Sequence, residues 1–421
     1  MSILNDIFFM LDVLPGTLTG ILMGTFLGII LGTVSGIIPG VHSNTLAGVL
    51  LSLQVVLIGL LGPVALACAM FSALITHTFV DAIPSTFLGV PDADTSLSVL
   101  PAHALCLEGN GEEAVRIAAL GSAAAIILAV PLSLLCFYLL PALQPYFDWW
   151  IGLLLLATVG YMIVTSDAPL WALGLFLISG MLGMFALRYA FLTWHLLAGG
   201  SAILMPLLTG LFGISVLLTA SRGSVPAQQF RGIRMEDRTV VKCSFLGTIA
   251  GIAVGWLPGL STASANGVLA SVIGYEKDRR AYILATNAAN TANAFIGLAA
   301  LFALARERNG VMVAIAELPL PSFSELMVAG MLAAVAAYCI TVWLSRSAHL
   351  LGGFDSLWLN RVVIVFVVLL SIFLTGPFGI FVLILATALG LVPHFINLPR
   401  VYCMGAIMVP VMLYSFGIAW I

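Results

Sequence analysis

Residues 28–52 read GIILGTVSGIIPGVHSNTLAGVLLS, and residues 247–271 read GTIAGIAVGWLPGLSTASANGVLAS. When Pro39 is set on Pro258, an offset of 258 − 39 = 219 positions, the glycines of the two stretches coincide. In each stretch an apolar segment runs into a Pro-Gly pair and continues as a polar segment. Proline removes a backbone N–H donor and clashes with the preceding helical turn, so we expect a helix to break at each pair. The chain therefore holds two copies of one broken helix.

The composition is that of a membrane protein. Of the 421 residues, 62% are hydrophobic and only 8% are charged, whereas soluble domains carry about 25% charged residues. Several apolar runs reach or approach the roughly 20 residues that a helix needs to cross a bilayer. These runs are 16–38, 117–140, 151–165 with 169–187, 190–219, 323–345 and 362–392. We therefore expect an all-α polytopic membrane protein with about 10 to 12 membrane segments, some of them broken.

Other bulk features exclude several classes of protein. The six cysteines are scattered and form no CxxC pair, so neither a metal site nor a disulfide framework is predicted. The net charge is −3 without a basic stripe, which gives no indication of nucleic-acid binding. The first residues carry Asp6 and Asp12 but no Lys or Arg, which is the wrong flank for a cleavable signal peptide.

Lysines and arginines gather in two places that indicate the topology. One group lies within 221–242 and the other within 277–280. The positive-inside rule places both groups in the cytoplasm, so the segment 243–275 between them is expected to enter the membrane and return as a re-entrant hairpin. The equivalent hairpin of the first half has no positive flank, which places it and the N-terminus outside.

The two halves are thus expected to be inverted relative to each other. We predict a first membrane repeat at 1–220, a cytoplasmic linker loop at 221–242 and a second membrane repeat at 243–421, within one integral membrane domain. Arg306 and Arg308 do not fit this topology, because the apolar helix before them should end outside.

Both breaks are candidate sites for an anion. A helix that restarts after a break presents free N–H groups and a partial positive charge, and Ser, Thr and Asn add donors at the cap positions. Two such starts could bind one carboxylate or phosphate near the midplane. Close helix packing explains the Gly-x-x-x-Gly spacing equally well, but it does not explain the Pro-Gly pairs. The candidate substrate-binding residues are Pro39, Gly40, His42, Ser43, Asn44 and Thr45, and Pro258, Gly259, Ser261, Thr262, Ser264 and Asn266.

A second polar stretch, HTFVDAIPSTFLGVPDADT at 77–95, lies among apolar residues. Ionisable groups inside a membrane are costly and usually functional, and His77 and Asp81 would share a helix face. Coupling to H+ or Na+ is the functional interpretation. The alternative is a membrane-surface loop over 84–101 whose aspartates are simply solvated. The candidate ion-coupling residues are His77, Asp81, Asp92, Asp94 and Thr95.

Three asparagines, Asn287, Asn290 and Asn293, follow the second break on one apolar segment. Amides can coordinate a cation or bind a substrate carboxylate, so all three are further substrate-binding candidates. The alternative is that they form interhelical hydrogen bonds that hold the bundle together. The segment occupies the same place after its hairpin as the acidic stretch does after the first.

These motifs together resemble a known family. They follow in the order Pro39-Gly40, Pro91-Asp92-x-Asp94-Thr95-Ser-x-Ser, Pro101-x-His103, Glu108-Gly-x-Gly-Glu-Glu-Ala, and then a helix from Arg116. This order is similar to that in the large membrane subunit of tripartite tricarboxylate transporters, closest to its shorter archaeal branch, over most of the chain. The resemblance implies a permease for citrate-like or other carboxylates driven by an ion gradient. It also implies a small membrane subunit and a periplasmic binding protein as partners.

We therefore predict a secondary active transporter, not an enzyme, in the cell membrane. It would move a small organic anion, coupled to H+ or Na+ and without a resident cofactor, either alone or as a homodimer. The alternative is a polyprenyl- or lipid-phosphate translocase, which arginines near the site would favour, although neither hairpin contains one. A third class, an intramembrane aspartyl enzyme, would need two catalytic carboxylates such as Asp81 and Asp92. An enzyme does not explain the repeated half.

Overall fold

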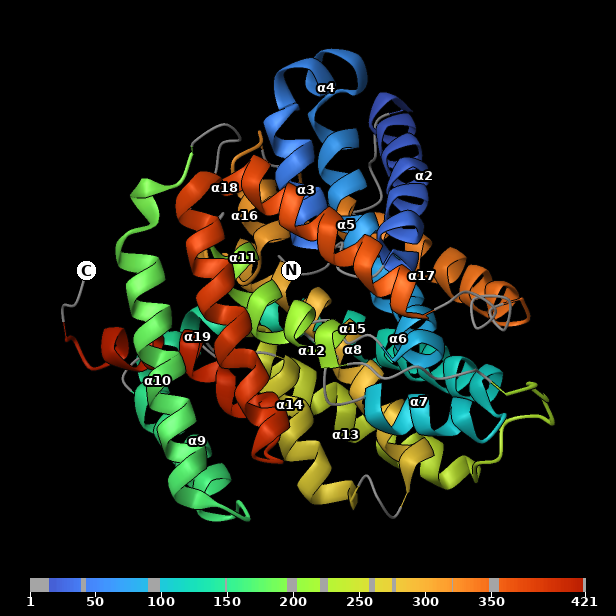
Figure 1. The fold of residues 1–421 in the computed structure, drawn as a ribbon. Coiled ribbons are helices and arrows are strands. Elements are labelled where there is room, and N and C mark those ends of the chain that lie inside the picture. The colour runs from blue at the N-terminus through green and yellow to red at the C-terminus, as the bar shows by residue number, and fades with distance from the viewer. Residues whose placement is uncertain are drawn as a thin grey trace.

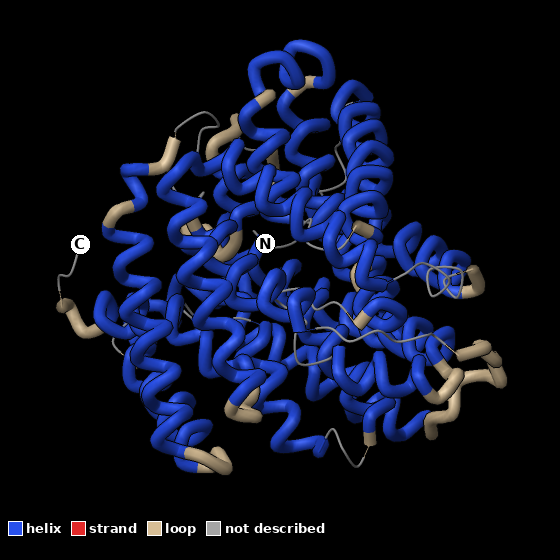
Figure 2. The backbone as a smooth tube through the Cα atoms, in the orientation of Figure 1, coloured by secondary structure: helices blue, strands red, loops and turns tan. Residues whose placement is uncertain are grey.

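The computed structural model describes residues 15–38, 43–89, 99–147, 150–194, 203–219, 226–256, 262–274, 278–319, 321–347 and 356–418. Most of these residues are helical, and no strand occurs among them (Figure 2). The prediction of an all-α protein is therefore confirmed.

The helices of the first half are α2 (Pro15–Ile37), α3 (Ser43–Ser52), α4 (Gln54–Leu61), α5 (Pro63–Val80), α6 (Ala82–Leu88), α7 (Val99–Leu107), α8 (Gly111–Phe147), α9 (Ile151–Val164), α10 (Pro169–Arg188), the 3-10 turn η1 (Ala190–Leu192), α11 (Leu204–Leu208), the π-helical turn η2 (Thr209–Ile214) and α12 (Ser215–Thr219). Those of the second half are α13 (Asp237–Trp256), α14 (Thr262–Leu269), the π-helical turn η3 (Ala270–Gly274), α15 (Arg279–Leu304), α16 (Gly310–Ala316), α17 (Phe323–Ser345), α18 (Ser356–Phe395), the 3-10 turn η5 (Arg400–Met404) and α19 (Gly405–Ser415).

Among the described residues, eight helices are long and apolar enough to cross a membrane. They are Leu18–Ile37, Pro63–Leu88, Gly111–Leu143, Pro169–Arg188, Asp237–Trp256, Arg279–Leu304, Phe323–Ser345 and Thr375–Phe395. Large apolar side chains lie exposed on these helices, with Leu170 85% and Phe26 67% exposed. Such side chains are suited to contact with lipid rather than water. The prediction of a polytopic membrane protein is confirmed.

The glycines before the first break hold α2 against α5. A Cβ atom at Gly28 would overlap the carbonyl oxygen of Ala69, and one at Gly32 would overlap that of Ala73. Because both contact positions advance together along the chain, α2 and α5 run parallel. The helices α3 and α4 lie between them in the sequence, and the four helices stand together in blue in Figure 1.

The second half repeats this packing in the same register. Side chains at Gly247 and Gly251 would overlap the carbonyl oxygens of Ala285 and Ala289, so α13 and α15 also run parallel. The contacted residues on α5 and α15 differ by 285 − 69 = 216 positions, and 289 − 73 gives the same value. The spacing of these glycines therefore serves close helix packing, as the alternative interpretation proposed.

The two parallel pairs point in opposite directions. The rings of Phe71 and Phe295 pack edge to face with centroids 5.7 Å apart. Farther along α5, the hydroxyl oxygens of Thr78 and Thr291 lie 3.2 Å apart. From the first contact to the second, the residue number increases on α5 and decreases on α15. These two central helices are therefore antiparallel. The pair α2–α5 therefore runs against the pair α13–α15.

The first arm of the second hairpin is longer than the sequence indicated. The helix α13 has 20 residues because it begins at Asp237, within the segment expected to be linker. At a rise of about 1.5 Å per residue it is as long as a membrane span. The parallel helix α15 nevertheless extends farther than α13. Gly255, next to the last residue of α13, packs against Ile296, and α15 continues from there to Leu304.

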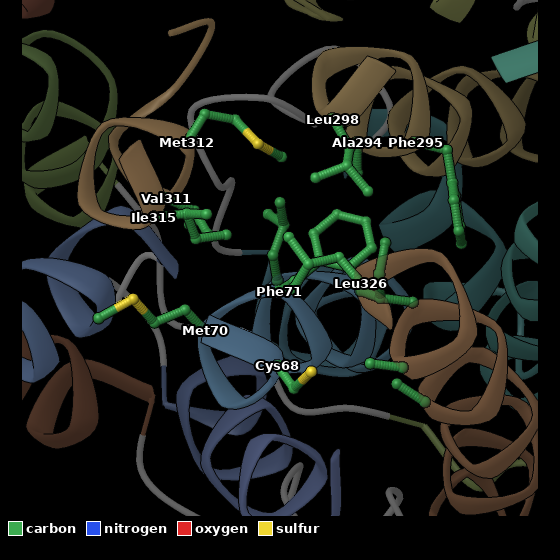
Figure 3. Packing of buried hydrophobic residues seen from close by; sticks show 14 of the residues in the cluster. Cys68, Met70, Phe71, Ala294, Phe295, Leu298, Val311, Met312, Ile315 and Leu326 are labelled. Atoms are coloured by element: carbon green, nitrogen blue, oxygen red, sulfur yellow. The ribbon is translucent and has the colours of Figure 1, made fainter. Parts of the chain in front are cut away.

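Helices of each half pack against the central helix of the other. The first-half helix α8 lies along α15, where a Cβ at Gly121 would overlap the Leu284 carbonyl. The second-half helix α17 lies along α5, and Ser72 Oγ donates a hydrogen bond to the Ala329 carbonyl at 3.4 Å. Figure 3 shows Phe71 among apolar side chains from α15, α16 and α17. The described parts of the two halves thus share one core.

An ionic cluster joins the halves at the start of α8. Both carboxylate oxygens of Glu113 accept hydrogen bonds from the Arg280 guanidinium, at 2.8 and 2.9 Å. The same carboxylate accepts a bond from the Arg234 backbone N–H at 2.8 Å. Glu113 is only 1% exposed. The linker, the start of α8 and the start of α15 therefore meet at one end of the molecule.

Candidate functional site

Nine of the predicted site residues lie outside the described residues, as do the side chains of Thr45 and Ser264. These nine are Pro39, Gly40, His42, Asp92, Asp94, Thr95, Pro258, Gly259 and Ser261. The described candidates are Ser43, Asn44, Asn266, His77, Asp81, Thr262 and the three asparagines of α15.

Both helices that follow a break begin inside the protein. The first residue of α3, Ser43, is 2% exposed, and the first residue of α14, Thr262, is 1% exposed. Asn44 Oδ1 accepts a hydrogen bond from the Val311 N–H at 3.3 Å, at the start of α16. The polar segment after the first break is therefore bonded to the second half of the chain.

The asparagines of α15 have separate surroundings. Asn287 and Asn290 are buried, and Asn287 Nδ2 donates to the Ile283 carbonyl of its own helix at 2.8 Å. Asn293 Nδ2 donates to Thr262 Oγ1 at 3.3 Å, which joins α15 to α14. Asn293 thus makes an interhelical bond of the kind the packing alternative expected.

His77 lies on α5 at the position that matches Asn293 on α15, because 293 − 77 is again 216. Its Nδ1 atom lies 3.1 Å from Ser35 Oγ on α2. Each of the two residues therefore ties its central helix to a helix of its own hairpin. The offset of 219 positions that aligns the two Pro-Gly pairs does not reveal this match. The second hairpin is three residues shorter than the first, so the offset beyond it is 216.

A small cavity between α6, α7, α8 and α15 brings Asp81 and Asn287 together. It is lined by Asp81, Ala82, Ser85, Thr86, Ala102, Ala118, Ile283 and Asn287. Asp81 is 5% exposed and Ser85 7%, and α6 continues the helical course past Asp81. The described beginning of the stretch 84–101 is thus buried helix rather than surface loop. The cavity volume is about 10 Å³, the room that one water molecule needs.

Sequence reasoning missed Arg308, which lies in the turn between α15 and α16. Its Nη2 atom donates to the Val254 carbonyl at 2.8 Å and its Nε atom to the Gly255 carbonyl at 3.3 Å. These carbonyls belong to the last turn of α13, where a helix lacks intrahelical donors. One signal in the sequence could have indicated that Arg308 binds the end of α13. Arg306 and Arg308 do not fit the topology that the positive-inside rule predicts. The rule describes charges in loops, whereas Arg308 folds back onto the last turn of α13.

The Arg308 side chain is half-buried. Burial, together with the positive charge of Arg306, lowers the pKa of the Arg308 guanidinium to about 10, so the group is still protonated at neutral pH. The chain turns back at Ala305, which has a left-handed φ of 51°, and the Arg306 N–H donates to the Ala300 carbonyl at 3.3 Å. A residue in the left-handed conformation is a common way for a helix to end.

The segment 305–311 touches both broken helices. Arg308 is bonded to the last turn of α13, and Val311 is bonded to Asn44 of α3. A Cβ atom at Gly310 would lie 2.9 Å from Asn44 Cβ, so the contact with α3 leaves no room for a side chain there. The segment therefore connects the end of α13, in the second hairpin, with the start of α3, in the first.

The described helices define a multi-pass membrane protein. Residues 22–405 match the family model of the tripartite tricarboxylate transporter TctA family, and the chain belongs to this family. The family consists of transporter components rather than enzymes, as the sequence predicted.

A curated relative is an uncharacterized protein of Methanocaldococcus jannaschii, 30% identical over 246 residues. The match covers 58% of this chain, and the chain spans 60% of the relative's length. No solved structure matches the chain.

Proposed function

We propose that this protein is a secondary active transporter that moves a small organic anion, a carboxylate, and that the solute binds between the tips of the two hairpins. The observation that carries the proposal is the segment 305–311, bonded to α13 at one break and to α3 at the other. Discontinuous helices that meet at the midplane supply backbone groups to a transported solute without exposing them to lipid. Membership of the family supports the carboxylate class.

The coupling ion is proposed to bind beside Asp81. Asp81, Ser85, Thr86 and Asn287, each with a side-chain oxygen, line one cavity. Oxygen-rich surroundings of this kind suit a dehydrated Na+, and a buried carboxylate suits H+ transfer. Because Asp81 and Asn287 come from antiparallel helices of different halves, ion binding there would couple the movement of the halves. His77 remains a candidate through its proximity, one helical turn before Asp81.

Two inverted-topology repeats, 1–220 and 243–421, are proposed, with 221–242 as the cytoplasmic linker. The opposite directions of the pairs α2–α5 and α13–α15 support this arrangement. Glu113, Arg234 and Arg280 gather at one end of the molecule, and the positive-inside rule favours the cytoplasm for that end. The N-terminus would then lie outside. Partnership with a small membrane subunit and a periplasmic binding protein, as the resemblance implies, is part of the proposal.

A polyprenyl-phosphate translocase is the second candidate, and one observation favours it. An arginine beside the break suits a phosphate as well as a carboxylate, and Arg308 is bonded to α13 at that point. The family description favours the carboxylate. A competition assay with both anions separates these two candidates.

A ligand screen by thermal unfolding in detergent tests the proposal. Citrate, shorter di- and monocarboxylates, inorganic phosphate and a short-chain polyprenyl phosphate would each be added with and without Na+. A ligand present at about 100 times its Kd stabilises the folded state by about 2.7 kcal/mol. We expect a carboxylate to raise the Tm, and more so with Na+ if Na+ is the coupling ion. Stabilisation by polyprenyl phosphate alone would favour the second candidate. No shift with any anion would contradict an anion site.

A further inference from the structure

Part of the linker crosses the turn between α7 and α8 as a non-helical segment, residues 226–234, which we call the strap. The Gln229 N–H donates a hydrogen bond to the Gly109 carbonyl at 2.9 Å. Gly109 has a left-handed φ of 82°, and a Cβ atom there would lie 3.1 Å from the Ala227 carbonyl oxygen. The strap therefore lies so close to the turn that a glycine is favoured beneath it.

One side chain of the strap is bonded to both helices of this turn. Gln228 Oε1 accepts a hydrogen bond from the Gly111 N–H at 2.7 Å, at the first residue of α8. Gln228 Nε2 donates to the Cys106 carbonyl at 3.0 Å, near the end of α7. Groups at helix ends lack partners within their own helix. Gln228 therefore supplies an acceptor to one helix end and a donor to the other.

Two further contacts attach the strap to α8. The Arg234 N–H donates to Glu113 Oε1 at 2.8 Å. The Arg116 guanidinium lies 4.2 Å from the centre of the Phe230 ring, which is the geometry of a cation–π contact. Together with the bond at Gly111, these contacts fix the strap along the first two turns of α8.

The strap lies at the end of the molecule that is closest to the cavity at Asp81. On α15 the cavity residue Ile283 follows Arg280 of the ionic cluster by 283 − 280 = 3 positions. On α8 the cavity residue Ala118 follows Glu113 by 118 − 113 = 5 positions. At a rise of about 1.5 Å per residue, these separations are about 4.5 and 7.5 Å along the helices. The cavity is therefore one to two helical turns beneath the ionic cluster to which the strap is bonded.

Gly111 is the point at which the strap, α6 and α7 meet. A Cβ atom at Gly111 would lie 2.8 Å from Gln228 Oε1. It would also lie 3.0 Å from Phe87 Cζ and 3.1 Å from Cys106 Sγ. Phe87 and Cys106 are buried, and Phe87 directly follows Thr86, which lines the cavity. The strap therefore lies over side chains that adjoin the cavity.

We propose that the strap is a lid over the cavity at Asp81, closed while Gln228 is bonded to Gly111 and Cys106 and open when these bonds break. The inference rests on the proposed function, since it treats the cavity as the site of the coupling ion. It adds a segment of the linker that controls access to this site. Most residues of the strap are exposed, and segments held by a few exposed hydrogen bonds open more readily than core helices.

Labelling of a thiol in the cavity tests the proposal. Ser85→Cys introduces the thiol, and methanethiosulfonate ethylammonium, a small cation, is the probe. Each neutral hydrogen bond favours the closed strap by about 2- to 10-fold. In the Ser85→Cys background we therefore expect Gln228→Ala, which removes two such bonds, to raise the labelling rate about 5- to 100-fold.

The matched control is Gln229→Ala. It removes a side chain that is bonded to the exposed Arg231 but keeps the backbone bond to Gly109, so the labelling rate should not change. A lower Tm of Gln228→Ala with an unchanged labelling rate, as a merely structural strap predicts, would overturn the proposal. An equal rise in both variants would also overturn it.

Hydrogen exchange of the unmutated protein covers the case in which the variants fail to fold. The N–H groups of Gln229 and Gly111 are both bonded across the contact between the strap and the turn. We expect both to exchange about 10-fold or more faster than N–H groups in the middle of α15, because the strap opens without unfolding of that helix. Exchange as slow as in α15 would overturn the proposal.

Neither measurement depends on transport. If Gln228→Ala raises the labelling rate in a protein that transports no carboxylate, the lid is supported and the proposed function is contradicted. If an ion gradient drives carboxylate uptake and Gln228→Ala leaves the labelling rate unchanged, only the lid is contradicted. Failure of the two ideas is therefore distinguishable.

Discussion

Single residues at the ends of helices decide how the candidate site is assembled. Ala305 reverses the chain, Arg308 binds the carbonyls of the broken α13, and Asn309 Oδ1 accepts a hydrogen bond from the Met312 N–H at the start of α16. None of these three residues lies in a Pro-Gly stretch. The site therefore depends on a short turn that the sequence repeat does not include.

Ala305→Gly should stabilise the protein. A left-handed conformation costs an alanine roughly 1 kcal/mol, and glycine adopts it freely. Ala305 is exposed and has a φ of 51°. We expect a small rise in Tm in detergent, equivalent to about 0.5 to 1 kcal/mol.

The neighbouring Ala303 supplies the control for this prediction. It lies inside α15, where glycine is less favourable than alanine by about 1 kcal/mol. Ala303→Gly should therefore lower the Tm. A fall in Tm for both variants would contradict this description of the turn.

At the scale of helices, the sequence predicted the elements well and their register poorly. The apolar runs and the glycine packing could both be predicted from local composition and spacing. The match of His77 with Asn293 could not, because the shorter second hairpin shifts the register by three residues. The contact of Arg308 with α13 could not either, since it joins segments more than fifty residues apart.

Gly251→Ala should separate α13 from α15. The added methyl group would overlap the Ala289 carbonyl oxygen, which belongs to backbone and cannot rotate away. Overpacking of this kind costs typically about 1 to 3 kcal/mol. We expect a lower Tm and a loss of uptake, because the second hairpin is displaced.

The matched variant is Gly174→Ala in α10. No atom lies within 4 Å of a Cβ built at Gly174, and alanine is the better helix former. This variant should keep or slightly raise the Tm. An equal loss in both variants would show that the effect of Gly251→Ala is not due to helix packing.

At the scale of the whole molecule, the two halves share their central contacts. The first-half helix α8 packs along α15, and the second-half helix α17 packs along α5. Contacts between segments distant in the sequence follow from tertiary packing. The sequence repeat could therefore predict two similar halves, but not that a helix of each half packs against the central helix of the other. The cavity at Asp81 and Asn287 is lined by residues of both halves.

Glu113→Gln should loosen the connection between the halves. Glu113 is buried and bonded to both Arg280 and the Arg234 backbone. Removing one partner of a buried ion pair costs about 3 to 5 kcal/mol. We expect a fall in Tm of several degrees.

The pair of Glu108 with Arg279 provides the comparison, because these side chains are 53% and 40% exposed. Exposed ion pairs contribute about 0 to 1 kcal/mol. Glu108→Gln should thus leave the Tm nearly unchanged. Equal effects in Glu113→Gln and Glu108→Gln would mean that the buried cluster does not hold the halves together.

An ion bound beside Asp81 is proposed to drive the uptake of an organic anion. The most direct test is uptake of a radiolabelled carboxylate into proteoliposomes under an inward Na+ or H+ gradient. The matched control is Asp167→Asn, which removes an exposed carboxylate between α9 and α10. We expect Asp81→Asn to abolish accumulation while the protein stays folded, and Asp167→Asn to keep it. Accumulation by Asp81→Asn at the unmutated rate would contradict coupling through this carboxylate.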